Sequence, residues 1–267
     1  MEYILISLTG LVAGVLGGLL GIGGSVVMIP ALVWVFSSVS DRPETVHQYQ
    51  AAAMIVNFLL AGPAALRHAR AKAIYAGVWK HLAPAALAGI VVGVLVSRAG
   101  VFTGENERHM RMAFGVFLLY VAGYNSWRMR SPMVEGVSRE KADAMPAWKK
   151  IAVGLPMGFA AGLLGIGGGA LAVPAMQIVL RLPLRNAIAT SAATIFTISW
   201  LGAIVKNASL ASDGSVTRSL ILAAILAPTA MAGAYLGGHL THTLPLRVVR
   251  GALVVLMLAA AWKMLVR

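Results

Sequence analysis

Apolar residues fall into eight long runs along this chain, and polar residues gather between the runs. Most of the runs approach the ~20 apolar residues that carry an α-helix across the hydrocarbon core of a membrane. They cover residues 3–36, 49–66, 74–97, 111–127, 151–180, 186–206, 218–238 and 246–265. The pattern predicts an all-α, polytopic integral membrane protein.

The runs at 3–36 and 151–180 each contain a cluster of glycines. A single helix over residues 3–36 would be about 50 Å long, well beyond the ~30 Å of the hydrocarbon core. Glycine tolerates backbone conformations that break a helix, and the clusters lie at 21–25 and 165–169. We therefore expect each run to fold either as a re-entrant hairpin or as two short crossings.

The glycine clusters belong to a sequence that occurs twice. Residues 10–31 and 154–175 align without gaps at an offset of 144 and share 12 of 22 residues. Such self-similarity indicates an internal duplication. We predict a first transmembrane repeat over 1–127, a basic cytoplasmic linker over 128–150 and a second transmembrane repeat over 151–267. Each repeat is expected to hold one glycine-broken helical hairpin and three further spans.

Charged loops favour opposite orientations for the two repeats. The loop at 67–80 carries four basic residues and no acid, whereas its counterpart at 206–218 carries two basic residues and one acid. The loop after the broken run has the opposite bias, with one base and two acids at 37–47 but two arginines at 181–185. Basic loops tend to stay in the cytoplasm. The charges therefore predict an inverted repeat with both termini outside, and two parallel four-helix repeats are the alternative.

Composition narrows the class of function. Apolar residues make up 59% of the chain and charged residues 12%, about half the charged share of a soluble domain. The net charge of +13 is expected to reflect cytoplasmic loops and anionic lipid, and not nucleic acid, because basic residues do not interleave with aromatic ones. The chain has no cysteine, which excludes disulfides and thiolate metal sites. We expect no cofactor and no metal site.

The acidic residues point to an anion as the substrate. All nine lie in loops or at the N-terminus, whereas proton relays and cation pathways usually need carboxylates within the spans. A half-helix that begins at a glycine break directs free N–H groups and the positive end of its dipole towards the membrane interior. The candidate anion-binding residues at the two breaks are Gly23, Gly24, Ser25, Gly167, Gly168 and Gly169.

Polar side chains within the apolar runs are the other candidates. Gln50 and Asn57 lie in the second segment of the first repeat, and Thr190, Ser191 and Thr194 lie in the matching segment of the second. Hydrocarbon penalises such groups unless they face a cavity or a partner. For the hydroxyls the alternative is a bond to the carbonyl four residues earlier, or contact with a neighbouring helix.

Two features have simpler interpretations. The spacing Gly14-x-x-x-Gly18, repeated at Gly158 and Gly162, is typical of close helix–helix contact and need not mark a site. Lys206 lies near the end of a span, where a long side chain ordinarily extends to the interface. A place at the mouth of an anion path is the alternative for Lys206.

The doubled segment Gly-x-x-x-Gly-Leu-Leu-Gly-Ile-Gly-Gly-Gly/Ser…Pro, with the later Ala189-Thr190-Ser191, resembles the sulfite exporter TauE/SafE family, also called toluene sulfonate uptake permeases. The resemblance covers nearly the whole chain. It implies a multi-pass carrier of the bacterial inner membrane that moves sulfite, sulfoacetate or other small organic anions. In the first repeat Gln50-Ala51 stands where family repeats often carry Thr-Ser, so the two halves are not expected to contribute identical groups.

Taken together, these features favour a secondary transporter of small anions, most simply sulfite or organosulfonates. Alternating access would occur around a midplane site at the two breaks. A carrier of small carboxylates, an anion channel and a membrane-embedded enzyme are the alternatives, the last disfavoured because no nucleophile–base pair or metal cluster lies within the runs. The expected partners are a small anion, the lipid bilayer and a coupling ion, H⁺ or Na⁺. The sequence does not indicate the oligomeric state.

Overall fold

The computed structural model describes residues 2–20, 23–39, 45–130, 136–210, 216–240 and 246–266, and every regular element in these ranges is helical. The first repeat contributes α1 (Glu2–Leu20), α2 (Ser25–Val39), α3 (Val46–Arg70), α4 (Ala76–Ser97), η1 (Gly104–Asn106) and α5 (Glu107–Arg130). A short helix, α6 (Arg139–Asp143), lies in the linker. The second repeat contributes α7 (Ala147–Leu164), α8 (Gly169–Val179), α9 (Leu184–Leu210), α10 (Val216–Leu240) and α11 (Leu246–Val266). The expected all-α class is confirmed.

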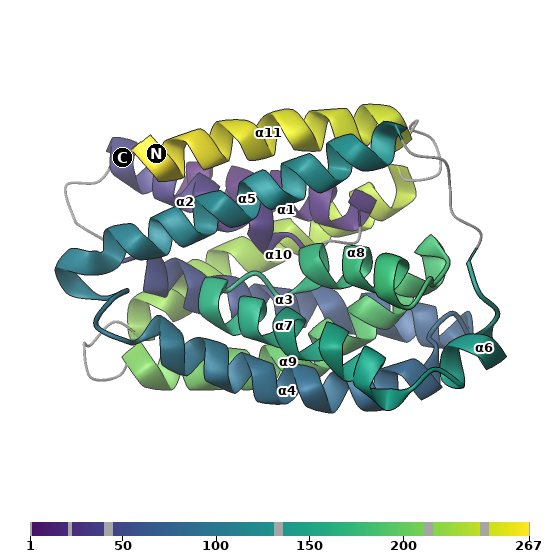
Figure 1. The fold of residues 1–267 in the computed structure, drawn as a ribbon. Helices are drawn as coiled ribbons and strands as arrows, with labels where there is room; N and C mark the ends of the chain where they lie inside the picture. Colours follow the sequence, from purple (N-terminus) through teal and green to yellow (C-terminus); the bar gives the residue numbers. More distant parts are fainter. Residues whose placement is uncertain are drawn as a thin grey trace.

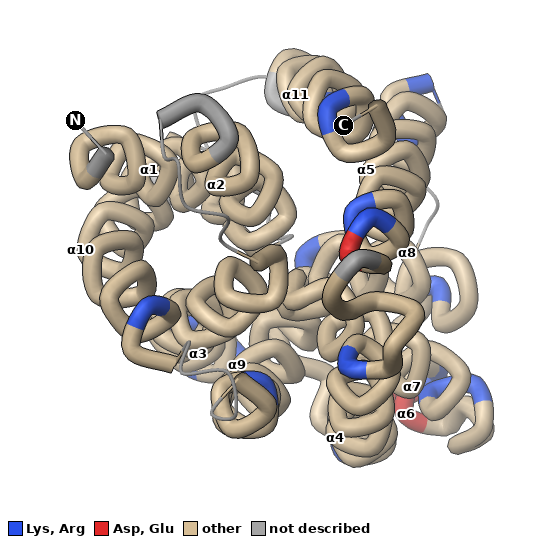
Figure 2. The backbone as a smooth tube through the Cα atoms, turned by 90° about the vertical axis from the view of Figure 1, so that its left-hand side faces the viewer, with Lys and Arg blue, Asp and Glu red and all other residues tan. Residues whose placement is uncertain are grey.

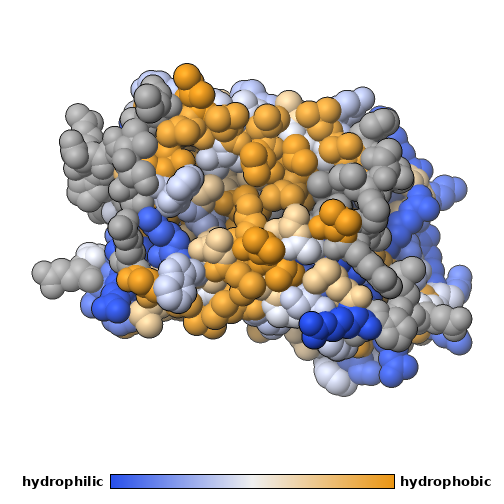
Figure 3. Space-filling view, turned by 90° about the horizontal axis from the view of Figure 1, so that it is seen from above, coloured by the Kyte–Doolittle hydropathy of each residue, from blue (hydrophilic) through white to orange (hydrophobic). Residues whose placement is uncertain are grey.

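Among the described residues, four helices are long and apolar enough to cross a membrane: α3, α4, α9 and α10. The helices run roughly side by side along one direction (Figure 1). Apolar side chains form a band across the middle of the molecule, and hydrophilic side chains gather towards its two ends (Figure 3). Such a band matches the surface that a bilayer covers. The chain is therefore a multi-pass membrane protein.

Six helices form a row whose second half repeats the pairings of the first. Neighbours along the row are α1, α10, α3, α9, α4 and α7, and α5 packs against α11. Seen along the helices, α3 and α9 lie between α10 and α4 (Figure 2). The first helix of each repeat thus packs on the fourth helix of the other, so neither repeat forms a separate bundle.

Small residues make these exchanged contacts close. A methyl group on Gly14 would overlap the carbonyl oxygen of Ala230 on α10, and one on Gly158 would overlap that of Ala86 on α4. The two contacts are related by the same offset of 144 as the sequence repeat. The helix-contact interpretation of the Gly-x-x-x-Gly spacing is confirmed, because only glycine lets the two backbones approach this closely.

Contacts at the helix ends give the directions of the helices. On α3 and α9, the start of one meets the end of the other, since His47 contacts Lys206 and Asn186 Nδ2 donates to the Ala73 carbonyl. On α5 and α11, Arg250 donates to the Arg128 carbonyl near one end, and Gly115 meets Leu265 near the other. Both pairs of corresponding helices are therefore antiparallel.

The second glycine break forms a hairpin. The backbone N–H of Val137, which precedes α7, donates to the carbonyl of Arg181, which follows α8, at 2.9 Å. The chain therefore enters α7 and leaves α8 at the same end of the molecule. At about 1.5 Å per residue, the 11 residues of α8 are too few to span the membrane. Of the two expectations for this run, the structure has the re-entrant hairpin.

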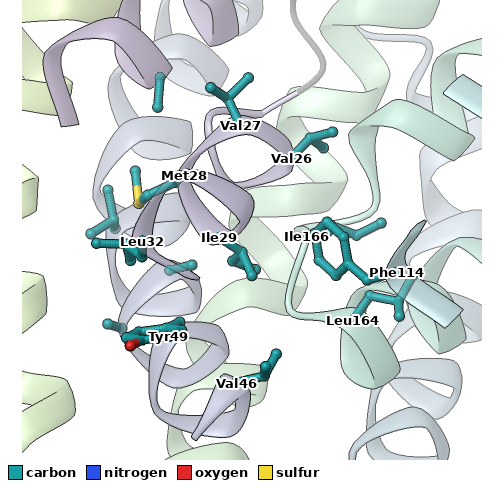
Figure 4. Packing of buried hydrophobic residues seen from close by; sticks show 14 of the residues in the cluster. Val26, Val27, Met28, Ile29, Leu32, Val46, Tyr49, Phe114, Leu164 and Ile166 are labelled. Carbon is teal, nitrogen blue, oxygen red and sulfur yellow. The ribbon is translucent and has the colours of Figure 1, made fainter. Parts of the chain in front are cut away.

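One apolar cluster packs α2 against α3 and the second break. Val26 and Ile29 of α2 lie near Ile166, Tyr49 of α3 lies on the other side of α2, and Phe114 of α5 closes the cluster (Figure 4). All of these side chains are buried. This packing holds the start of α2 close to the loop between α7 and α8, which fixes the two breaks relative to one another.

Candidate functional site

The two glycine breaks meet in the interior. A Cβ atom added to Gly23 would lie 3.6 Å from the Ile166 carbonyl oxygen in the other break and 3.8 Å from Asn57 Oδ1. A Cβ atom added to Gly167 would lie 2.8 Å from Asn57 Nδ2. Asn57, in the middle of α3, is therefore in contact range of both breaks.

Left-handed backbone makes these close approaches possible. Gly23 has φ of +86° and Gly167 has φ of +66°, a conformation that residues with a Cβ rarely adopt. Gly165 and Gly168 have the same handedness, at +74° and +78°. Glycine is thus needed here both for the turn and for the space beside Asn57.

A buried hydrogen bond ties Asn57 to the first break. Asn57 Nδ2 donates to Ser25 Oγ at 2.9 Å. Ser25 is the first residue of α2 and has no exposed surface, and Asn57 is 2% exposed. The polar centre between the breaks is therefore closed from solvent in this conformation.

Both breaks end at a helix N-terminus. The Gly24 carbonyl accepts from the N–H groups of Val27 and Met28, and the Gly168 carbonyl accepts in the same way from Leu171 and Ala172. The earlier N–H groups, on Ser25 and Val26 of α2 and on Gly169 and Ala170 of α8, have no carbonyl within their own helix to bond. Two positive helix ends therefore lie beside Asn57, an arrangement suited to an anion.

Gln50 extends the centre along α3. Its Nε2 donates to the Leu163 carbonyl at the end of α7, at 3.3 Å, and its Cβ would lie 2.7 Å from a Cβ on Gly165. Its Oε1 is buried and accepts no hydrogen bond from the described residues. A buried amide oxygen without a donor is costly, so this atom is available to a proton-bearing ligand or water.

The hydroxyls of α9 have other partners. Thr190 Oγ1 accepts from the backbone N–H of Tyr75 before α4, at 3.2 Å, and Thr194 donates to the Thr190 carbonyl at 2.8 Å. Thr190 thus bonds the chain before α4 and Thr194 bonds four residues back, the contacts that the alternative interpretation expects. Ser191 is buried, and its hydroxyl has no partner among the described residues.

The remaining predicted glycines support the backbone of the breaks. A Cβ on Gly24 would lie 3.1 Å from the Ala13 carbonyl, and one on Gly168 would lie 2.8 Å from the Met157 carbonyl. Gly169 is buried at the start of α8. The structure therefore brings together Gly23, Ser25, Gln50, Asn57 and Gly167, with Gly24, Gly168 and Gly169 behind them.

Sequence reasoning missed a second polar cluster. Lys206 is 0% exposed and donates to Ser97 Oγ at 2.7 Å, with His47 Nδ1 3.0 Å from its Nζ. The expectation that this lysine extends to the interface was wrong, because α3 and the end of α4 cover it. His47 sits in a polar segment that gave no signal by itself, since its partner is 159 residues away.

Metal-binding groups were sought among the described residues, and no cluster of three or more His, Asp or Glu side chains was found there. The described acids closest to the spans include Glu107, at the start of α5, where it accepts from the Val46 N–H. The polar centre between the breaks is thus built from amides, a hydroxyl and backbone N–H groups.

The fold and this centre define a multi-pass helical membrane protein in which two broken helices of a duplicated chain meet. The family model described as "Sulfite exporter TauE/SafE" matches residues 6–264. The chain belongs to the sulfite exporter TauE/SafE family. In a bacterium, the membrane that holds such a protein is the inner membrane.

Several curated proteins are similar over most of this chain. One is "Probable membrane transporter protein MamO" of Paramagnetospirillum magneticum, 29% identical over 285 residues, which cover 96% of this chain but 43% of MamO. Another is "Probable membrane transporter protein YunE" of Bacillus subtilis, 25% identical over 217 residues, covering 76% of this chain and 78% of YunE. The chain thus spans less than half the length of MamO. No solved structure gives a significant match to this chain.

Proposed function

We propose that the protein is a secondary transporter of small anions that binds its substrate between the two glycine breaks. The observation that carries the proposal is the position of Asn57, in contact range of Gly23 and Gly167 and bonded to Ser25. Two helix N-termini beside one buried amide supply N–H donors and positive dipole ends. The printed names of the relatives, which call them membrane transporters, are consistent with this proposal.

The substrate is an oxyanion of sulfur, sulfite or an organosulfonate. An oxyanion presents several acceptor oxygens, which suit the donors of Ser25, Asn57 and the backbone at the starts of α2 and α8. The family description supports sulfite within this class. A small carboxylate has the same donor requirements, and the experiment below distinguishes the two.

The mechanism is alternating access between two inverted repeats. Corresponding helices that run antiparallel, and the exchange of first and fourth helices between repeats, support an inverted duplication. The burial of Asn57, Ser25 and Gln50 supports an occluded conformation, which a carrier must pass through. An open anion channel needs a continuous path, so occlusion favours the carrier.

Thermal unfolding of purified protein with sulfite, methanesulfonate, sulfoacetate or acetate, each with and without Na⁺, tests the assignment. A ligand that binds only the folded protein stabilises it by about 2.7 kcal/mol at a hundredfold excess over Kd. We expect a rise in Tm with the sulfur oxyanions. A rise with acetate alone would replace the substrate class, and no rise with any anion would contradict the proposal.

Replacing Asn57 by alanine should abolish the anion-dependent rise in Tm. The matched control is Asn125→Ala on α5, because Asn125 is a buried asparagine whose amide donates locally to the Val121 carbonyl. We expect Asn125→Ala to keep the anion response. If Asn57→Ala kept it as well, the site would lie elsewhere. In proteoliposomes, saturation and counterflow would support a carrier, and linear flux without counterflow would support a channel.

A further inference from the structure

Lys206 is a buried basic group whose side-chain partners are not acids. Its Nζ contacts Ser97 Oγ at 2.7 Å and His47 Nδ1 at 3.0 Å, and it forms no ion pair with the described carboxylates. Lys206 is fully buried and His47 is 3% exposed. Burying an ammonium without a counter-ion costs free energy that a neutral amine avoids.

The hydrogen bonds assign the protons of the pair. His47 Nε2 lies 2.9 Å from the Phe102 carbonyl oxygen, which can only accept, so Nε2 carries a hydrogen. Nδ1 of a neutral ring is then an acceptor, and Lys206 donates to it. Lys206 needs two N–H groups to donate to Ser97 Oγ and to His47 Nδ1. A neutral amine still has two N–H groups. Lys206 can therefore lose one proton without losing either hydrogen bond.

We propose that Lys206 and His47 form a proton-binding site that couples proton movement to anion transport. On uptake, one proton from water converts the neutral amine of Lys206 to the ammonium, which stays bonded to the neutral His47 ring. On release, that proton returns to water, leaving the amine and the ring neutral. The closed conformation seals the pair from water, so exchange occurs when this end of the bundle opens. This inference rests on the proposed transport function and names its coupling ion.

The charged groups of the neighbouring helices near this end of the bundle have partners of their own or act on the pair from a distance. Arg98, which follows α4, is close enough to act electrostatically on both Lys206 and His47. Glu107 of α5 accepts from the Val46 N–H, and Arg218 of α10 lies over the Phe36 ring. An anion bound at the neighbouring polar centre would attract a proton to the pair.

A short path joins the pair to the polar centre. Gln50 lies one turn beyond His47 on α3, beside the His47 ring, and its amide donates to the Leu163 carbonyl where α7 ends. A movement of the second break would therefore shift Gln50 and change the contacts of His47. Through Gln50, the proposed proton site is in contact with the helix that leads into the second break.

The first test measures the protonation of the proposed site in the absence of any anion. In ¹⁵N-histidine-labelled protein, the His47 resonances are assigned by their loss in His47→Gln. We expect the Nδ1 resonance to be that of a hydrogen-bonded acceptor, to shift with pH, and to lose both properties in Lys206→Met. An Nδ1 signal that neither titrates nor responds to Lys206→Met would overturn the proton site, whatever the protein transports.

The second test measures coupling. Methanesulfonate, whose own proton is lost far below neutral pH, is added to purified protein in weakly buffered solution containing a pH-sensitive dye. We expect proton uptake on binding by the wild type and none by Lys206→Arg, because the guanidinium keeps its proton at all working pH values. Lys150→Arg, at the other buried lysine, is the control and should leave the uptake intact.

The outcomes separate the two proposals. Anion binding with unchanged proton uptake in Lys206→Arg would overturn the coupling role while leaving the anion site in place. A titrating His47 resonance in a protein that binds no anion would contradict the proposed transport function and leave the proton site standing. His47→Gln provides a second variant if Lys206→Arg does not fold.

Discussion

Two lysines are buried at opposite ends of the helical bundle, and their surroundings differ in kind. Lys150, in the first turns of α7, is 1% exposed and donates to the carbonyl oxygens of Gly77 and Asp143, at 3.2 and 2.8 Å. Lys206, near the end of α9, contacts a histidine and a serine instead. Both carbonyls can only accept, and the neutral His47 ring likewise accepts at Nδ1, so in the proposed site the exchangeable proton is carried by Lys206 itself. The same residue type is therefore proposed to cross-link helices at one end and to exchange a proton at the other.

Further polar contacts surround Lys150 at its end of the bundle. Asn186 donates to the Ala73 carbonyl, and Arg139 of α6 lies 5.4 Å from the centre of the Tyr75 ring. Burial raises the pKa of the Tyr75 hydroxyl above its ordinary value, so this group stays neutral throughout the physiological range. This end therefore gains rigidity from contacts that do not change with pH.

The largest expected effect is a loss of folding stability in Lys150→Met. This variant tests whether Lys150 and Lys206 differ in role. The substitution removes two charge-assisted hydrogen bonds and leaves two carbonyls without this donor, at a cost of about 3 kcal/mol. Lys206→Met should cost less, about 1 kcal/mol, because the proposed neutral amine makes weaker hydrogen bonds than an ammonium does. Thermal unfolding of both variants in the same detergent measures the difference. Equal losses would show that both lysines act as cross-links.

A second, smaller effect is expected for Gly77→Ala. The new Cβ would lie 2.5 Å from Asp143 Cγ, so the Asp143 side chain or the backbone beside it, whose carbonyl binds Lys150, must shift. Overpacking of this kind typically costs 1–3 kcal/mol. Gly123→Ala is the control, since a Cβ there meets nothing within 4 Å. A Tm for Gly77→Ala that matches Gly123→Ala would mean that α6 yields easily and does not fix Lys150.

The smallest effect is expected for Ser97→Ala. It removes one hydrogen bond to Lys206 and costs about 1 kcal/mol, while the contact between Lys206 and His47 remains. We expect the His47 Nδ1 resonance to keep its pH dependence in this variant. A lost titration would show that Ser97, and not His47, controls the proton on Lys206.

Much of the polar centre between the two breaks could be predicted because its signals are local. A glycine cluster in an apolar run marks a helix break wherever the chain folds, and Asn57 stands out because hydrocarbon penalises an unpaired amide. The hydroxyls of α9 gave a weaker signal. Thr190 and Thr194 are polar residues in the same kind of run, but a threonine can satisfy itself four residues back or at a helix contact, as these two do.

The sequence by itself determined the all-helical membrane class, the duplication and the positions of the two breaks, because hydropathy and glycine act over a few neighbouring residues. Tertiary structure alone decided which groups meet. Asn57 and Gly167 are far apart in the chain, as are His47 and Lys206, and the packing of α3 against the second break and against α9 brings each pair together. Burial then changes what a residue does, since a lysine expected to reach water is enclosed beside a histidine. That outcome depends on packing between distant segments, which no local pattern encodes.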